Sequence, residues 1–119
     1  MGKRVLIIED NEILAHAYAA SLRTAGFQVA VARDGQAGLD AVGRFTPDIV
    51  VLDLMLPRVP GIDVLRRIRS DEAHAAIPVI VFSNRSDRTA EVWDAGATQV
   101  VMKADCPPKH LVEIVSSIA

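Results

Sequence analysis

Residues 49–53, Ile-Val-Val-Leu-Asp, decide the fold, because four consecutive apolar residues lead directly into an aspartate. An apolar run of this length, rich in β-branched residues, predicts a strand that is buried on both faces. Three other segments repeat the pattern and end in polar side chains: residues 5–10 (Val-Leu-Ile-Ile-Glu-Asp), 79–83 (Val-Ile-Val-Phe-Ser) and 100–103 (Val-Val-Met-Lys). If these strands are parallel neighbours, their polar groups converge at the sheet edge where open α/β folds bind ligands.

Strand and helix patterns alternate along the whole chain. The predicted strands are Arg4–Ile8, Phe27–Ala32, Asp48–Leu52, Ile77–Phe82 and Thr98–Met102. The predicted helices are Glu12–Ala25, Gly35–Arg44, Ile62–Ser70, Ser86–Ala95 and a last helix opened by Pro107-Pro108. This alternation implies a parallel sheet covered on both faces, and right-handed crossovers leave few ways to wind it. We predict an α/β fold, a flavodoxin-like doubly wound sheet of five parallel strands in the order 2-1-3-4-5, forming a three-layer (βα)5 sandwich.

Bulk composition excludes several classes of protein. The length of 119 residues fits one domain over residues 1–119, and a hydrophobic content of 50% argues against disorder. The net charge of −2 gives no basic footprint for nucleic-acid binding. Cys106 is the single cysteine and cannot form an internal disulfide, which favours a reducing compartment. There is no apolar stretch of membrane-spanning length and no secretory signal pattern, so we expect a cytoplasmic protein.

The polar residues at the strand ends indicate a site for a divalent cation and a phosphoryl group. Carboxylates are ligands for Mg²⁺ and can also accept phosphoryl groups covalently, as Asp53 is placed to do. Glu9 and Asp10 supply two more carboxylates, whose mutual repulsion a cation would relieve, although acidic residues also favour the start of a helix. Ser83 offers a hydroxyl donor and Lys103 a point charge for phosphoryl oxygens. Each of these residues taken alone also has an ordinary structural explanation.

The whole chain resembles the receiver domain of two-component response regulators. The residues that carry the resemblance are Glu9-Asp10, the stretch from Asp53 to Pro57 with Gly61, Ser83, Ala95-Gly96-Ala97 and Lys103. The resemblance implies that Asp53 accepts a phosphoryl group from a histidine kinase or a histidine phosphotransferase. It also implies that Asp10, Asp53 and the backbone carbonyl of Met55 bind Mg²⁺ directly, that Glu9 acts through water, and that Ser83 and Lys103 grip the phosphoryl oxygens. The downstream partner is an unknown protein, and we expect a monomer or a weak dimer.

The chain departs from the family pattern beside the predicted site. Glu9 replaces the usual aspartate, and Asn84 replaces a small residue after Ser83. Val100 occupies the position of an aromatic ring that turns inward on activation. The family lysine is usually followed by proline, commonly after a cis peptide, and then by an aromatic residue, where this chain has Ala104 and Asp105. We predict a trans Lys103–Ala104 peptide, since a cis bond before alanine costs roughly 3 kcal/mol, and signalling without the usual serine–aromatic switch.

Two alternatives come from other functional classes. A pseudo-receiver that acts as a phosphorylation-independent docking module would explain the altered residues, although Asp10, Asp53, Ser83 and Lys103 oppose it. A small phosphatase with an aspartyl-phosphate intermediate would need a second acid two residues after Asp53, where this chain has Met55. We therefore do not expect an enzyme. Trp93 on the fourth helix is expected to pack in the core or to be partly exposed, although on the output face it would suit a partner contact.

Overall fold

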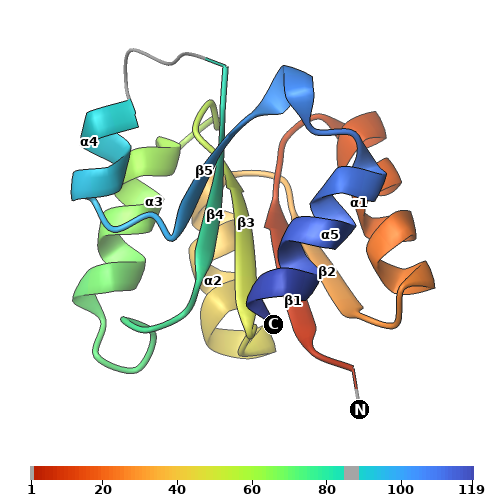
Figure 1. Cartoon of the computed structure of the whole chain (residues 1–119). Helices are drawn as coiled ribbons and strands as arrows, with labels where there is room; N and C mark the ends of the chain where they lie inside the picture. The colour runs from red at the N-terminus through yellow and green to blue at the C-terminus, as the bar shows by residue number, and fades with distance from the viewer. Residues whose placement is uncertain (1, 85–88) are drawn as a thin grey trace.

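The computed structural model describes residues 2–84 and 89–119, and it contains one parallel five-stranded sheet in the order β2-β1-β3-β4-β5 (Figure 1). This confirms the predicted fold class and strand order. The strands are β1 (Arg4–Ile8), β2 (Gln28–Ala32), β3 (Ile49–Asp53), β4 (Val79–Ser83) and β5 (Gln99–Met102).

Helices cover both faces of the sheet (Figure 1). On one face lie α1 (Glu12–Thr24) and α5 (Pro108–Ile118). On the other lie α2 (Gly35–Phe45), α3 (Gly61–Ser70) and α4 (Thr89–Asp94). Successive strand residues point to opposite faces, so both sets must be apolar when both faces are covered.

The first strand shows this alternation directly. Val5 and Ile7 pack in the cluster with α1 and α5, whereas Leu6 and Ile8 pack in the cluster with α2, α3 and α4. All four side chains are at most 1% exposed. The uninterrupted apolar runs in the sequence are therefore the consequence of a three-layer fold.

Element boundaries differ from the predicted ones mainly at β4. This strand begins at Val79 instead of Ile77, because Pro78 has no N–H to donate to a ladder; the carbonyl of Pro78 still accepts a hydrogen bond from the N–H of Val50 at 2.9 Å. The predicted start of the fourth helix at Ser86 lies outside the described residues. The other predicted boundaries agree to within one residue, and β3 is the one that matters, because it includes Asp53 as its last residue.

The carboxyl ends of the strands bring the predicted site residues together. In the sheet register Asp53 pairs with Phe82, and Ser83 pairs with Met102, the residue before Lys103. Lys103 opens a short 3-10 turn, η2 (Lys103–Asp105). The Lys103–Ala104 peptide is trans, as predicted, and no peptide bond in the described part of the chain is cis. Among the helices of residues 2–84 and 89–119, none is long and apolar enough to cross a bilayer.

Candidate functional site

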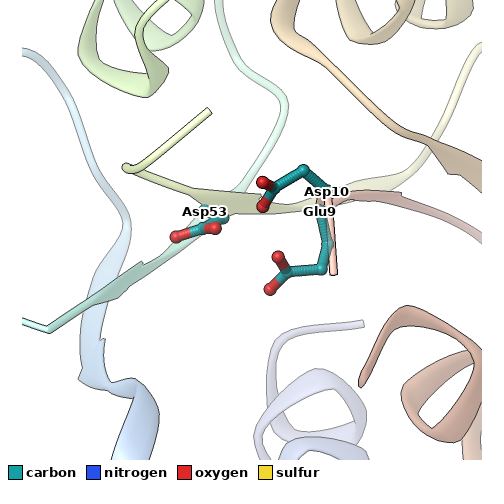
Figure 2. A group of neighbouring side chains, drawn as sticks. All are labelled: Glu9, Asp10 and Asp53. Atoms are coloured by element: carbon teal, nitrogen blue, oxygen red, sulfur yellow. The ribbon is translucent and has the colours of Figure 1, made fainter. Parts of the chain in front are cut away.

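Three carboxylates gather at the carboxyl edge of the sheet, at the ends of β1 and β3 (Figure 2). Glu9, Asp10 and Asp53 each offer an oxygen, and these oxygens all lie within 4.8 Å of one another. Glu9 and Asp53 are buried, whereas Asp10 is exposed. This is the grouping predicted from the sequence: the structure brings the three acidic side chains together.

Lys103 supplies the positive charge of the cluster. Its Nζ lies 2.6 Å from Oε1 of Glu9 and 3.2 Å from Oδ2 of Asp53. Burial by itself lowers the pKa of this ammonium group, but its contacts with Glu9 and the charge of Asp53 outweigh burial and raise the pKa of Lys103 overall. Lys103 therefore stays positively charged at neutral pH.

Glu9 occupies the most constrained position in the cluster. Its side chain is 2% exposed, and its Oε2 accepts a hydrogen bond from the Asn11 N–H at 3.1 Å. Its Oε1 lies in an ion pair with Lys103 but has no hydrogen bond of regular geometry among the residues that the structure describes. Burial raises the pKa of Glu9 to about 7, and the charge of Asp53 adds to this effect, while Lys103 and the Asn11 N–H oppose it.

These donors fit a hard divalent cation. Three carboxylates whose oxygens lie within 4.8 Å of one another, two of them buried, form an arrangement that oxygen-preferring Mg²⁺ would stabilise. Because one carboxylate of the three is exposed, a bound ion could keep several of its waters.

The loop after β3 approaches Asp53 closely. The N–H of Met55 donates to Oδ1 of Asp53 at 3.2 Å, so the backbone of Met55 lies beside the carboxylate. The Met55 residue itself is 60% exposed. Gly61 lies behind this loop, where a Cβ atom would collide with the carbonyl oxygen of Asp53. Only glycine permits this approach, which explains its place in the sequence pattern.

The remaining predicted residues lie at the end of β4 or on α4, β5 and η2. Ser83 ends β4 and is 2% exposed, and the next residue, Asn84, is exposed. Val100 is half-buried and packs against the hydrophobic core between the sheet and the helices α2, α3 and α4. Ala104 is exposed in η2. Trp93 is 46% exposed on α4, so it is not a core residue.

One contact near the site has no signal in the sequence. The helical pattern predicts Tyr18 only as a buried residue of the first helix, but its hydroxyl donates a 2.8 Å hydrogen bond to the Cys106 carbonyl, just beyond η2. The two residues are 88 positions apart. No local pattern could have paired them, because the contact depends on how α1 and the end of β5 pack.

Comparison with known proteins identifies the family. Residues 5–116 match the response regulator receiver domain. DNA-binding response regulator MtrA of Mycolicibacterium smegmatis is 40% identical over 114 residues, which cover 94% of this chain and 48% of that protein. Sensory transduction protein RegX3 of Mycobacterium bovis is 42% identical over 101 residues, covering 83% of this chain and 43% of that protein. The chain spans about half the length of these curated relatives.

Solved structures with the same fold include chemotaxis response regulator CheY4 of Vibrio cholerae. It superposes with a TM-score of 0.93 at 20% identity over the full length of both chains. The receiver domain of the Francisella response regulator 1452 gives a TM-score of 0.88 at 24% identity, covering 98% of this chain and 96% of that one. The strand order, the acidic cluster and the match over residues 5–116 agree: the chain belongs to the response regulator receiver domain family.

Proposed function

We propose that this receiver domain accepts a phosphoryl group on Asp53 in a Mg²⁺-dependent reaction. One observation carries the proposal: the buried Asp53 carboxylate lies within 4.8 Å of two other acids and 3.2 Å from the Lys103 ammonium. Such a group is costly to bury unless a cation compensates it. Placed at the edge where α/β sheets bind ligands, it favours a reactive site over a structural ion pair.

The donor is a phosphohistidine on a histidine kinase or a histidine phosphotransferase. A carboxylate oxygen of Asp53 forms the new bond to phosphorus while the phosphorus–nitrogen bond breaks. The electron pair stays on the imidazole nitrogen, which takes a proton from solvent. Mg²⁺, held by Asp10, Asp53 and the Met55 carbonyl with Glu9 acting through water, would neutralise charge on the transferring group. Lys103 and Ser83 hold the phosphoryl oxygens, and positioning with charge neutralisation provides the catalysis.

Phosphate incorporation from a small acyl-phosphate donor with Mg²⁺ tests the proposal. A phosphate-affinity gel should show a shifted band for the wild type and none for Asp53→Asn. Asp63→Asn is the matched control, because this α3 carboxylate is half exposed and pairs with Arg66 at 3.7 Å; it should incorporate phosphate at the wild-type rate. Incorporation that persists in Asp53→Asn would contradict the assignment of the acceptor.

The output step is proposed to work without an aromatic switch. Val100 is half-buried and has no ring that could rotate between exposed and buried positions. NMR spectra with and without a phosphoryl mimic should show changes around Asp53 and Ser83. They should not show the rearrangement of the face formed by α4, β5 and α5 that ordinary receivers undergo. A rearrangement of that face as in ordinary receivers would contradict this part of the proposal.

A second candidate is a pseudo-receiver that docks a partner regardless of phosphorylation. It is favoured by Asn84, Val100, Ala104 and Asp105, which replace the usual residues around the readout face. Mg²⁺ dependence distinguishes the two candidates. Partner binding that is unchanged by Mg²⁺ and by Asp53→Asn would favour docking.

The partner is proposed to be a protein. A net charge of −2 gives no overall basic footprint for nucleic-acid binding, so we do not expect this domain itself to bind DNA. We place the reaction in the cytoplasm, where the free thiol of Cys106 would remain reduced. A monomer or a weak dimer is expected in sedimentation.

A further inference from the structure

Tyr18 is a buried phenol that links α1 to the segment carrying Lys103. Its side chain is among the largest that the protein buries completely, with 1% exposure. Its hydroxyl donates to the carbonyl of Cys106 at 2.8 Å. This is a specific use of a tyrosine, since phenylalanine would fill the same core volume without the hydrogen bond.

The hydrogen bond continues to the backbone of Lys103. The N–H of Cys106 donates to the carbonyl of Lys103 at 3.3 Å and thereby closes η2. The Cys106 side chain is 2% exposed and packs in the same cluster as Tyr18. Two consecutive hydrogen bonds therefore connect α1 with the residue whose ammonium contacts Glu9 and Asp53.

The ring of Tyr18 is fixed at the same time. It stacks on Phe82 with ring centroids 5.2 Å apart and an angle of 28° between the planes. Phe82 pairs with Asp53 in the sheet and immediately precedes Ser83. The ring of Tyr18 is thus packed against β4, next to β3, which ends at Asp53.

The state of the hydroxyl suits this role. Burial, together with nearby acidic groups, raises the pKa of Tyr18 to about 12, so the phenol stays protonated and remains a hydrogen-bond donor at neutral pH. The turn it supports has alanine at position 104 and hence no proline ring to restrict its backbone.

We infer that Tyr18 is a positioning residue, which anchors η2 through the Cys106 carbonyl so that the ammonium of Lys103 stays on Asp53 and Glu9. Its consequence for phosphoryl transfer rests on the proposed function. Its effect on the position of Lys103 does not, because the contacts of Lys103 with Glu9 and Asp53 involve only side chains of this chain.

The first test uses the metal-free protein, with NMR of lysines labelled with ¹³C at Cε. In the wild type the two Hε protons of Lys103 should have distinct shifts, because the ammonium is held between two carboxylates. In Tyr18→Phe these shifts should move toward those of the exposed Lys109, and amide exchange at residues 103–106 should accelerate by about 5-fold. The matched control is Ser117→Ala, which removes a hydroxyl-to-carbonyl bond of 2.7 Å within α5. It should leave both measurements unchanged.

The second test is a double-mutant cycle on the phosphorylation rate. Tyr18→Phe should slow incorporation at Asp53 by about 5-fold while Mg²⁺ affinity stays within about 2-fold, and the slowing should disappear in a Lys103→Ala background. An equal slowing in both backgrounds, or unchanged Lys103 signals in the first test, would overturn the inference. A general loss of stability would produce the equal slowing.

The two tests separate this inference from the proposed function. If the wild type takes up no phosphoryl group, the proposed function fails, while the Lys103 signals still decide the role of Tyr18. If Tyr18→Phe does not fold, Phe82→Leu replaces it, because this variant removes the ring that stacks on Tyr18 and keeps the Tyr18 hydroxyl. If the Tyr18 ring becomes mobile in Phe82→Leu while the two Hε shifts of Lys103 stay as distinct as in the wild type, the inference is overturned. If the ring becomes mobile and the two Hε shifts of Lys103 partly average, the inference is supported.

Discussion

The Nζ atom of Lys103 lies 2.6 Å from Oε1 of Glu9, which is closer than its 3.2 Å approach to Oδ2 of Asp53. A single ammonium group thus spans the acids that follow β1 and end β3. Both carboxylates are at most 3% exposed in their side chains, and the lysine side chain is 16% exposed. Among residues 2–84 and 89–119, Lys103 is the cation in contact with both carboxylates, so we expect their charge balance to depend on it.

Loss of Lys103 should destabilise the metal-free protein. Lys103→Met removes the ammonium group that contacts the buried Glu9 and Asp53 carboxylates, and breaking a buried pair in this way costs about 3 kcal/mol. Urea unfolding in EDTA at pH 8 should show this loss, and the added substitution Glu9→Gln should recover part of it. Lys109→Met, at an exposed position of α5, is the control and should change the free energy of unfolding by less than about 0.5 kcal/mol. Equal effects of the two lysine substitutions would contradict the charge balance described above.

The raised pKa of Glu9 predicts that the metal-free protein loses stability as the pH rises. The ordinary pKa of a glutamate side chain is 4.5, and in the fold the pKa of Glu9 is about 7, so the folded state binds this proton more tightly than the unfolded state. The stabilising contribution is complete below pH 4.5 and is lost as the pH rises through about 7. The loss is at most about 3 kcal/mol. The free energy of unfolding in EDTA should fall between about pH 5 and about pH 8 in the wild type.

The matched pair for this measurement is Glu9→Gln and Glu12→Gln. Glu9→Gln should flatten the decline, because glutamine does not titrate. Glu12→Gln should leave the decline of the free energy of unfolding intact, because 76% of the Glu12 side chain is exposed. A wild type with no decline over this pH range would show that Glu9 is ionised in the fold.

Magnesium should stabilise the wild type through the acidic cluster. An ion that binds only the folded state at about 100 times its dissociation constant adds about 2.7 kcal/mol to the free energy of unfolding. Asp10→Asn should remove most of this increment and should raise the stability of the metal-free protein, since one of three mutually repelling carboxylates is gone. Thermal unfolding in buffer without calcium, repeated across a Mg²⁺ titration that starts at zero Mg²⁺, measures both the stabilisation by Mg²⁺ and the stability of the metal-free protein. Asp40→Asn, on the exposed side of α2, serves as the control and should respond to Mg²⁺ like the wild type.

The sequence predicts the features that depend on local patterns, such as apolar runs and the lengths of the connections between strands. Asp53 ends an apolar run on a strand that must be buried on both faces, so its place at the carboxyl edge follows from strand polarity. The strand order follows from short right-handed connections. The acidic cluster follows in turn, because β1 and β3 are neighbours in that order.

The contacts that the sequence could not predict join distant segments through side-chain geometry. The preference of Lys103 for Glu9 over Asp53 depends on the length of the glutamate side chain and on where η2 directs the lysine. The bond from Tyr18 to Cys106 depends on how α1 packs beside the end of β5. The start of β4 was misplaced because the apolar pattern includes Ile77 and Pro78, whereas the ladder requires an N–H that proline lacks.

Gly61 and Gly43 form a matched pair for the last prediction, because both are helical glycines with ordinary φ angles and different surroundings. A Cβ atom at Gly61 would collide with the carbonyl oxygen of Asp53 and lie 2.6 Å from Cα of Leu54, and both are backbone atoms that cannot move aside cheaply. A Cβ atom at Gly43 would meet nothing within 4 Å.

Gly61→Ala should therefore destabilise the protein by about 2 kcal/mol and displace the loop that carries Met55. It should also weaken Mg²⁺ binding, because the displaced backbone lies beside the Asp53 carboxylate. Gly43→Ala should stabilise the protein by roughly 0.5 to 1 kcal/mol, since alanine favours the helix and restricts the unfolded chain. Urea unfolding of the two variants, with and without Mg²⁺, checks both signs. A Gly61→Ala protein with wild-type stability and wild-type Mg²⁺ affinity would show that the β3–α3 loop can move without disturbing Asp53.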